Sequence, residues 1–343
     1  MQRELTSGRL LDASGALSQA GWSTRLIRAY DRADIRAPQW RIKEWDYYLI
    51  DDGENALCLT IDDNSYMGML SATLLNRQTP CERTKSIILP FTRGKVGLSG
   101  TSARGDVELH SGKSWIRFRN DGKTRLLECH MEKFEGGAPL DASVKLTDVP
   151  RDSMVIATPF AGKKTAFYYN QKIIGMRAEG EVLYCGKRYF FEPKKSFGLL
   201  DWGRGVWTYE NTWYWGAAQG AIAQHVVGFN IGYGFGDTSR ASENMLFVDG
   251  KAHKLDRLTF NIPMDADGRE RYLEPWTFTS CDGRFEMEFT PILDRASCTD
   301  VKLICSDQHQ VFGYFDGRAL LDDGTELYLS HFLGFAEKVY NKW

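Results

Sequence analysis

A carboxyl group and several tryptophans occur close together in residues 200–216. If this segment is an extended strand, its odd-numbered side chains all point to the same side. That face would carry Asp201, Trp207, Trp213 and Trp215. A carboxyl group next to aromatic walls loses hydration, which raises its pKa and lets it donate a proton near neutral pH. Asp201 is therefore a candidate general acid, and the three indoles are candidate ligand contacts.

Two further residues of this segment could act on a ligand, but they also have a structural explanation. Trp202 could present its ring to a cationic centre, because the face of an indole attracts positive charge. Arg204 could orient Asp201, although a guanidinium beside a carboxylate stabilises the anion and lowers its pKa. An aromatic core strand with an Asp–Arg pair in a turn explains the same residues, and the sequence leaves both interpretations open.

A second group of acidic residues lies in residues 41–48. In a strand, Glu44 and Asp46 would point the same way, about 6.6 Å apart. This is near the lower end of the roughly 6.5–9.5 Å that separates the carboxyl groups of inverting glycosidases. Catalytic carboxyls of that kind must converge from opposite sides of the bond, however, whereas neighbours on one strand face point in parallel. Glu44 and Asp46 are thus candidate ligand contacts, with a solvated acidic face as the alternative.

Residues 229–236 alternate bulky apolar side chains with small or polar ones. One face carries Tyr233 and other apolar residues, and the opposite face carries Asn230 and glycines. A bare glycine face lets a ligand or another backbone approach closely, or lets the sheet coil sharply. Asn230 and Tyr233 are therefore candidate ligand contacts. Glu243, downstream of this strand, and Glu210 are candidates for activating a water molecule.

Length and charge exclude several classes of function. A chain of 343 residues exceeds what one hydrophobic core usually holds, which predicts two domains or one unusually large one. The 43 basic and 45 acidic side chains give a formal charge of −2, so we expect no nucleic-acid partner. The sequence has no run of 18 apolar residues, so we expect no transmembrane segment.

The seven cysteines show no Cys-x-x-Cys spacing, and residues such as Cys58 lie between apolar neighbours. We interpret them as buried thiols in a reducing compartment. Because the N-terminus also shows no secretory signal, the sequence predicts a cytoplasmic location. The six histidines show no metal-binding pattern and no phosphate-binding loop occurs, so we expect neither a metal nor a cofactor. No pattern indicates an oligomeric state.

The elements that must position these residues are mostly strands. Asp-Gly, the preferred core of a two-residue hairpin turn, occurs seven times, and five of these lie after residue 245. Residues 285–289 alternate apolar and acidic side chains as a half-buried strand does. Few helices are expected. Residues 25–36 show only a ragged amphipathic pattern, and residues 333–340 could form one short terminal helix.

A polar, proline-bearing break at residues 192–196 separates two strand-rich halves. We therefore predict an all-β fold with two lipocalin- or calycin-like antiparallel β-barrels, or two strongly curled sheets. The N-terminal one would comprise residues 1–196 and the C-terminal one residues 197–343. Closing each sheet would remove the exposed edges that so many strands create.

Four motifs extend over nearly the whole chain, namely residues 41–48, 201–207, 228–234 with 243–244, and 306–313. These motifs resemble those of a bacterial family known as domain of unknown function 2804. That family has no established activity, so the resemblance implies no reaction. Its architecture is similar to that of the double-calycin proteins, lipocalin-like pairs that include carotenoid 1,2-hydratase. The resemblance therefore implies two calycin-like barrels.

Three functions agree with these observations. The first is binding of a mostly apolar or cyclic small molecule inside or between two barrels, with hydratase- or isomerase-like acid–base chemistry on it. The second is a carbohydrate-active enzyme of the glycoside hydrolase type, because tryptophan and tyrosine rings stack on sugars. The third is a non-catalytic carrier or structural protein, which would be favoured if the tryptophans of residues 202–215 are ordinary core.

Overall fold

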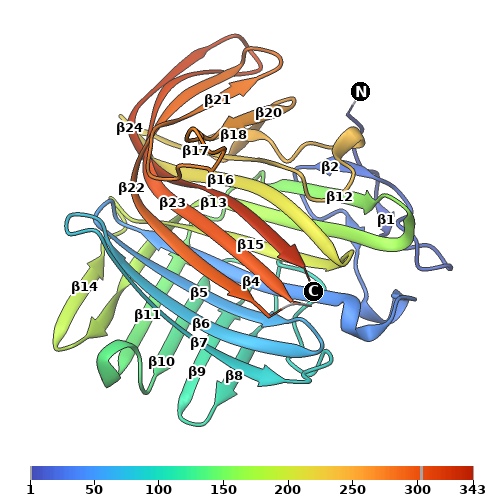
Figure 1. The fold of residues 1–343 in the computed structure, drawn as a ribbon, viewed down its shortest axis with the longest axis horizontal. Coiled ribbons are helices and arrows are strands. Elements are labelled where there is room, and N and C mark those ends of the chain that lie inside the picture. The colour runs from blue at the N-terminus through green and yellow to red at the C-terminus, as the bar shows by residue number, and fades with distance from the viewer. Residues whose placement is uncertain (1, 302–303, 343) are drawn as a thin grey trace.

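The computed structural model describes residues 2–301 and 304–342, and the fold is nearly all antiparallel sheet (Figure 1). A 13-stranded sheet and a 9-stranded sheet account for most of it, forming one nearly closed barrel and one half-barrel. This confirms the predicted all-β class with two calycin-like curled sheets. The helices among the described residues are 3-10 turns of three residues each, and none is long and apolar enough to cross a membrane.

The first sheet is built from the N-terminal part of the chain. Its main path runs β7 (Cys81–Pro90), β6 (Met67–Asn76), β5 (Asn55–Asp63), β4 (Ile42–Asp51), β15 (Phe197–Val206), β13 (Lys163–Tyr184), β11 (Leu140–Thr147), β10 (Arg125–Met131), β9 (Ser114–Asn120) and β8 (Val107–Ser111). Three strands pair beside this path, namely β2 (Gly21–Ser23), β12 (Met154–Phe160) and β14 (Lys187–Phe191).

The second sheet follows the order β19 (Lys251–Lys254), β18 (Met245–Val248), β17 (His225–Tyr233), β16 (Glu210–Ile222), β24 (Glu326–Lys342), β23 (Cys305–Leu320), β22 (Phe285–Asp300), β21 (Trp276–Ser280) and β20 (Leu258–Asn261). Figure 1 shows the long strands β22, β23 and β24, in orange and red, lying across the blue strands of the first sheet. The remaining elements are the short pair β1 (Gly8–Arg9) and β3 (Arg28–Ala29), and the turns η1 (Arg32–Asp34), η2 (Gln39–Arg41), η3 (Glu135–Gly137) and η4 (Thr238–Arg240).

The chain passes from the first sheet to the second between Val206 and Glu210. The boundary predicted after residue 196 lies one strand earlier, because β15 still pairs with β4 and β13. This strand is the central one for the site, since Asp201 lies on it.

Several local expectations are corrected. Residues 333–340 are not a helix but part of β24, because they pair with β16 on one side and β23 on the other. Residues 25–36, which show only a ragged amphipathic pattern in the sequence, contain β3 and η1. Five of the seven Asp-Gly pairs form short turns between consecutive strands as predicted. Asp267-Gly268 lies in the longer loop between β20 and β21, and Asp316-Gly317 forms a bulge inside β23. Three cysteines expected to be buried are exposed, namely Cys185, Cys281 and Cys298.

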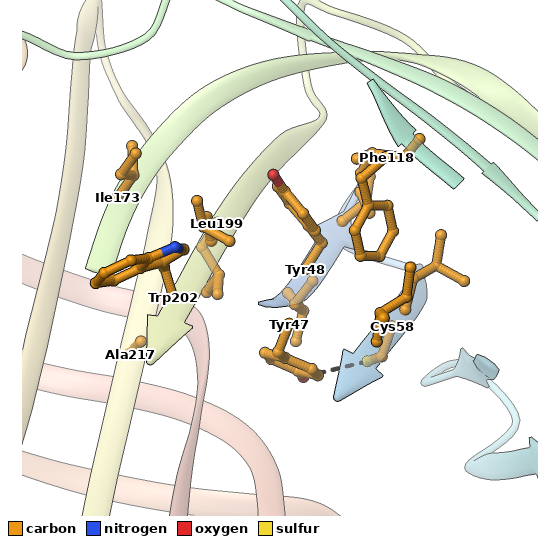
Figure 2. Packing of buried hydrophobic residues seen from close by; sticks show 14 of the residues in the cluster. Tyr47, Tyr48, Cys58, Phe118, Ile173, Leu199, Trp202 and Ala217 are labelled. Carbon is orange, nitrogen blue, oxygen red and sulfur yellow. Dashed lines mark hydrogen bonds between the residues drawn. The ribbon is translucent and has the colours of Figure 1, made fainter. Parts of the chain in front are cut away.

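Alternation along β15 separates its side chains into two sets. Trp202 packs into the first core, in edge contact with Tyr30 and Tyr169. Figure 2 shows Trp202 in that core, together with the neighbouring Tyr48–Phe118 contact. Asp201 lies on the other face of the strand, which faces the second sheet. The indole at 202 therefore belongs to the core rather than to the face that carries Asp201.

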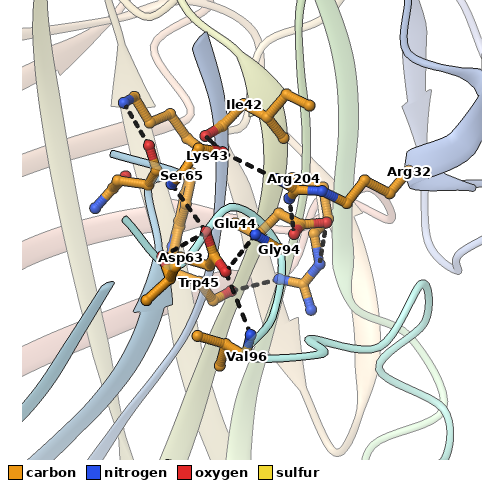
Figure 3. A network of polar contacts seen from close by, with 12 residues as sticks. Arg32, Ile42, Lys43, Glu44, Trp45, Asp63, Ser65, Gly94, Val96 and Arg204 are labelled. Atoms are coloured by element: carbon orange, nitrogen blue, oxygen red, sulfur yellow. Dashed lines mark hydrogen bonds and ion pairs between the residues drawn. The ribbon is translucent and has the colours of Figure 1, made fainter. Parts of the chain in front are cut away.

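Arg204 lies on the same face of β15 as Trp202, here called the inner face because it points into the first core, and is completely buried. Its guanidinium donates to the backbone oxygen of Trp45 (Figure 3). It also donates to the backbone oxygen of Ser99 and, at 2.9 Å, to the Asp46 carboxylate. The expected Asp201–Arg204 pair in a turn is therefore wrong, because this segment is one continuous strand. Gly203 and Gly205 keep it extended, since their bare face leaves room for neighbouring groups. A Cβ at Gly203 would lie 2.0 Å from the Trp45 ring.

The stability of the first sheet should depend strongly on Arg204. Replacing Arg204 by Met leaves Asp46 buried without its cation, so the free energy of unfolding should fall by about 3–5 kcal/mol. Arg318, on β23, pairs with Glu326 at the surface, and Arg318→Met should cost no more than about 1 kcal/mol. Urea unfolding of both variants measures the difference. Equal losses would contradict the structural role given to Arg204.

Candidate functional site

A cavity with about 490 Å³ of empty space lies between the two sheets. Its walls are mainly aromatic, and its floor carries four charged or titratable side chains. The lining comprises Trp45, Tyr168, Lys172, Asp201, Trp207, Trp213, Trp215, Phe235, Glu243 and Glu337. Neighbouring strands of both sheets, and the loop after β17, bring these residues together.

Asp201 forms a buried ion pair at the base of the cavity. Lys172, its direct cross-strand neighbour on β13, places Nζ 2.9 Å from Asp201 Oδ2. Asn170 donates its side-chain amide to Asp201 Oδ1 at 2.6 Å. Each of the two carboxylate oxygens of Asp201 already accepts from a donor. The geometry therefore makes Asp201 an acceptor rather than a proton donor.

The ammonium of Lys172 also contacts an aromatic face. Its Nζ lies 3.6 Å from the centre of the Trp215 ring, within the range of a cation–π interaction. The Trp215 Nε1 donates to Asn230 Oδ1 at 2.7 Å, which fixes the plane of the indole. This wall of the cavity is thus already arranged to accept a positive charge.

Glu337, on β24, is the carboxyl group whose protonation changes near neutral pH. It is buried, and burial is the main cause that raises its pKa from an ordinary 4.5 to about 7. Trp213 Nε1 donates to its Oε1 at 2.9 Å, and Gln310 Nε2 donates to its Oε2 at 3.0 Å. These donors stabilise the anion only in part, so desolvation prevails.

Glu243 lies at another side of the cavity and is also buried. Burial raises its pKa, while Lys172 and the Asn230 amide, which donates to Glu243 Oε2 at 3.2 Å, oppose that shift. The bare glycine face of β17 makes room for this side chain. A Cβ at Gly232 would lie 2.7 Å from Glu243 Cδ. The glycine pattern seen in the sequence thus allows close approach of a carboxyl group.

The aromatic walls form a continuous cluster. Trp45 stacks on Tyr168 with ring centres 6.0 Å apart and meets the edge of Trp207 at 5.4 Å. Phe235 contacts Trp207 at 4.7 Å and Trp213 at 5.2 Å. Such rings exclude water and offer faces of negative potential, which suit an apolar ligand and a developing cation.

The structure brings together part of the set predicted from sequence. Asp201, Glu243, Trp207, Trp213 and Trp215 all line the cavity, and Asn230 lies directly behind Trp215 and Glu243.

Other predicted residues lie away from the cavity. Glu210 is exposed and accepts a hydrogen bond from Tyr340. Tyr233 stacks on Tyr214 at the second core. Trp202 and Arg204 belong to the inner face described above.

Glu44 and Asp46 also lie on the inner face of the first sheet. Glu44 pairs with Arg32 (Figure 3) and accepts from the Tyr30 hydroxyl. Asp46 pairs with Arg204. Each carboxylate is thus neutralised by an arginine, and neither lines the cavity.

Five lining residues escaped the sequence analysis, namely Trp45, Tyr168, Lys172, Phe235 and Glu337. Lys172 and Glu337 each interrupt an apolar strand. Strand alternation predicts burial at both positions, and a charged residue at such a position is the sequence signal that could have identified these two site residues. Among the described residues, no group of three or more His, Cys, Asp or Glu side chains is placed to hold a metal ion.

The titration of Glu337 should be visible at its indole partner. In ¹⁵N-labelled protein, the Nε1–H signal of Trp213 should shift with a midpoint near pH 7, because it donates to a carboxyl group with that pKa. Glu337→Gln should abolish the shift, whereas Glu243→Gln should leave its midpoint in place. A midpoint near the ordinary 4.5, or a shift that survives in Glu337→Gln, would show that the assignment is wrong.

Comparison with known proteins agrees with this architecture. Kievitone hydratase from Nectria haematococca matches with a TM-score of 0.53 and 12% identity, covering 98% of each chain. An AttH-like protein from Nitrosomonas europaea matches with a TM-score of 0.55 and 10% identity, covering 92% of this chain and 97% of that one. Both have double-calycin-like folds, which confirms the fold implied by the resemblance.

No curated protein matches the sequence. The model of a family described as domain of unknown function (DUF2804) matches residues 2–343, as the four motifs indicated. The chain therefore belongs to the DUF2804 family.

Proposed function

We propose that the cavity binds a mostly apolar or cyclic small molecule that carries a carbon–carbon double bond, and that the protein adds water to that bond. The observation that carries the proposal is the combination of an acid, a carboxylate and indole faces in one cavity. A hydration needs a proton donor, a site that stabilises positive charge and a base for the attacking water.

Glu337 is the proton donor in this proposal. With a pKa of about 7, a substantial fraction of Glu337 is protonated at neutral pH. The sequence pattern suggested Asp201 for this role, but Asp201 is paired with the Lys172 ammonium at 2.9 Å. The acid is thus supplied by the second sheet, and the carboxylate by the first.

The positive charge that follows protonation would be stabilised by the indole rings. Trp213 and Trp215 lie beside Glu337 on adjacent strands, and Trp215 already holds the Lys172 ammonium against its face. Trp213 also lines the cavity, and its ring face would offer a carbocation the attraction that Trp215 gives to Lys172.

The Asp201 carboxylate would act as the base. Glu337 gives its proton to one alkene carbon, which leaves positive charge on the other carbon. A water oxygen bonds to that carbon and loses a proton to Asp201. One water molecule is thereby added across the double bond, and proton exchange with solvent restores both carboxyl groups. Glu243 remains the second candidate base, because it lines the same cavity.

The fold supports this proposal by analogy. One protein with the same double-calycin architecture is named a hydratase. The carbohydrate-active alternative loses support, because Glu44 and Asp46 are paired with arginines on the far face of the sheet. A cytoplasmic location stays a prediction.

The proposal predicts the effect of removing the acid. Wild-type protein incubated in H₂¹⁸O with isoprenoid alkenes should form an alcohol that carries the label, and mass spectrometry detects it. Glu337→Gln should lower the rate by roughly 10²–10⁴-fold, the usual contribution of a general acid. Asp201→Asn should also lose activity.

The matched control is Glu288→Gln, at an exposed position of β22, which should leave the rate unchanged. Full activity in Glu337→Gln would contradict the proposed role of the acid. Binding of the alkenes without any label uptake would instead support a non-catalytic carrier.

A further inference from the structure

The cavity continues into a larger groove between the two sheets, with about 2030 Å³ of empty space. Trp45, Asp201, Trp213, Trp215 and Glu337 line both the cavity and the groove. A molecule whose reactive end lies in the cavity can therefore extend along the groove. Among the residues that line the groove but not the cavity are many with hydroxyl, amide or charged side chains.

One wall of the groove is a row of side chains that begins at Asp201. Strand pairing places five residues side by side across the first sheet, in the order Asp201, Tyr47, Thr60, Ser71 and Ser86. Because neighbouring strands are about 4.8 Å apart, this row spans roughly 19 Å. All five line the groove and four of them carry a hydroxyl group.

The opposite wall is a shorter row on the second sheet. Pairing of β16, β24, β23 and β22 aligns Trp215, Glu337, Gln310 and Arg295. Arg295 Nη1 donates to Gln310 Oε1 at 3.0 Å, and Gln310 Nε2 donates to Glu337. A chain of two hydrogen bonds therefore links Arg295 to the acid of the cavity.

Arg295 is half-buried in the groove and retains donors for a further partner. A guanidinium has five N–H donors, and the bond to Gln310 uses one of them. Within residues 2–301 and 304–342, no carboxylate lies within 4.0 Å of Arg295 to form an ion pair. A desolvated arginine that lines a groove without a carboxylate partner is a suitable site for an anionic group.

We propose that the substrate is an elongated amphipathic molecule whose apolar, reactive end occupies the indole-walled cavity and whose carboxylate binds Arg295. The inference rests on the proposed function and names the substrate class of the same site. Glu82 also lines the groove, and its charge and that of Glu337 act on Arg295. A singly charged carboxylate therefore suits this position better than a phosphate dianion. The hydroxyl row would contact the part of the molecule between its two ends.

Binding of two probes that differ only in charge tests the proposal. Farnesoic acid and its methyl ester have the same carbon skeleton, and quenching of the tryptophan fluorescence reports binding of either. At pH 7.5 the acid should bind wild-type protein at least tenfold more tightly than the ester does, because an ion pair forms at Arg295. High salt should reduce that preference.

Variants at Arg295 test whether this residue causes the preference for the acid over the ester. Arg295→Gln should bind the acid only as tightly as the ester, and its affinity for the ester should equal that of wild-type protein. Arg295→Lys should keep part of the preference for the acid. Arg318→Gln, on the same sheet but exposed, should behave as wild type. Circular dichroism and thermal unfolding check that each variant is folded. If Arg295→Gln does not fold, the ratio of acid to ester affinity in wild-type protein still tests the proposal.

Equal binding of acid and ester by wild-type protein would overturn the proposal, and so would a preference that survives in Arg295→Gln. Tighter binding of farnesyl phosphate than of farnesoic acid would overturn the choice of a carboxylate. Because binding is measured without turnover, a clear acid preference together with no hydration would refute the proposed reaction alone. Hydration without an acid preference would refute the substrate class alone.

Discussion

The buried ion pair between Lys172 and Asp201 is the interaction on which the site depends. Removing two charges from water costs several kcal/mol each, so such a pair is stable only when its remaining polar atoms find partners. Asn170 satisfies Asp201, and the Trp215 ring covers the Lys172 ammonium. Trp215 comes from the second sheet, so the pair is complete only when the two curled sheets face each other.

This constraint also shapes the electrostatics around it. Covering the ion pair with rings excludes water from the adjacent carboxyl groups, which raises the pKa of Glu337 to about 7. Asp201 and Glu337 lie in one cavity, but Asp201 is paired with the Lys172 ammonium, whereas among the described residues no cation lies at ion-pair distance from Glu337. Two carboxyl groups in different environments are what acid–base chemistry at neutral pH requires.

Strand alternation explains both the successes and the failures of the sequence analysis. It correctly placed Asp201, Trp207, Trp213 and Trp215 on one surface, although the chain changes sheets between them. The same rule should have placed Trp202 and Arg204 on the opposite face. The glycines suggested a turn, whereas they leave room for the Trp45 and Trp207 rings.

The residues that were missed depend on long-range strand pairing. Lys172 meets Asp201 only because β13 pairs with β15, and Glu337 lies beside Trp215 only because β24 pairs with β16. Pairing between strands that are far apart in sequence is set by the packing of both sheets and leaves no local pattern. The all-β class follows from the local alternation and hairpin turns, but the composition of the cavity does not.

The central claim is that the cavity stabilises a positive charge on a bound hydrocarbon. Isothermal titration calorimetry with an alkyl chain that ends in a quaternary ammonium group, compared with its uncharged tert-butyl isostere, measures this directly. The account predicts that the ammonium compound binds at least tenfold more tightly, because the cavity is lined by indole faces and by three carboxyl groups against the one ammonium of Lys172. Equal or weaker binding of the ammonium compound would contradict it.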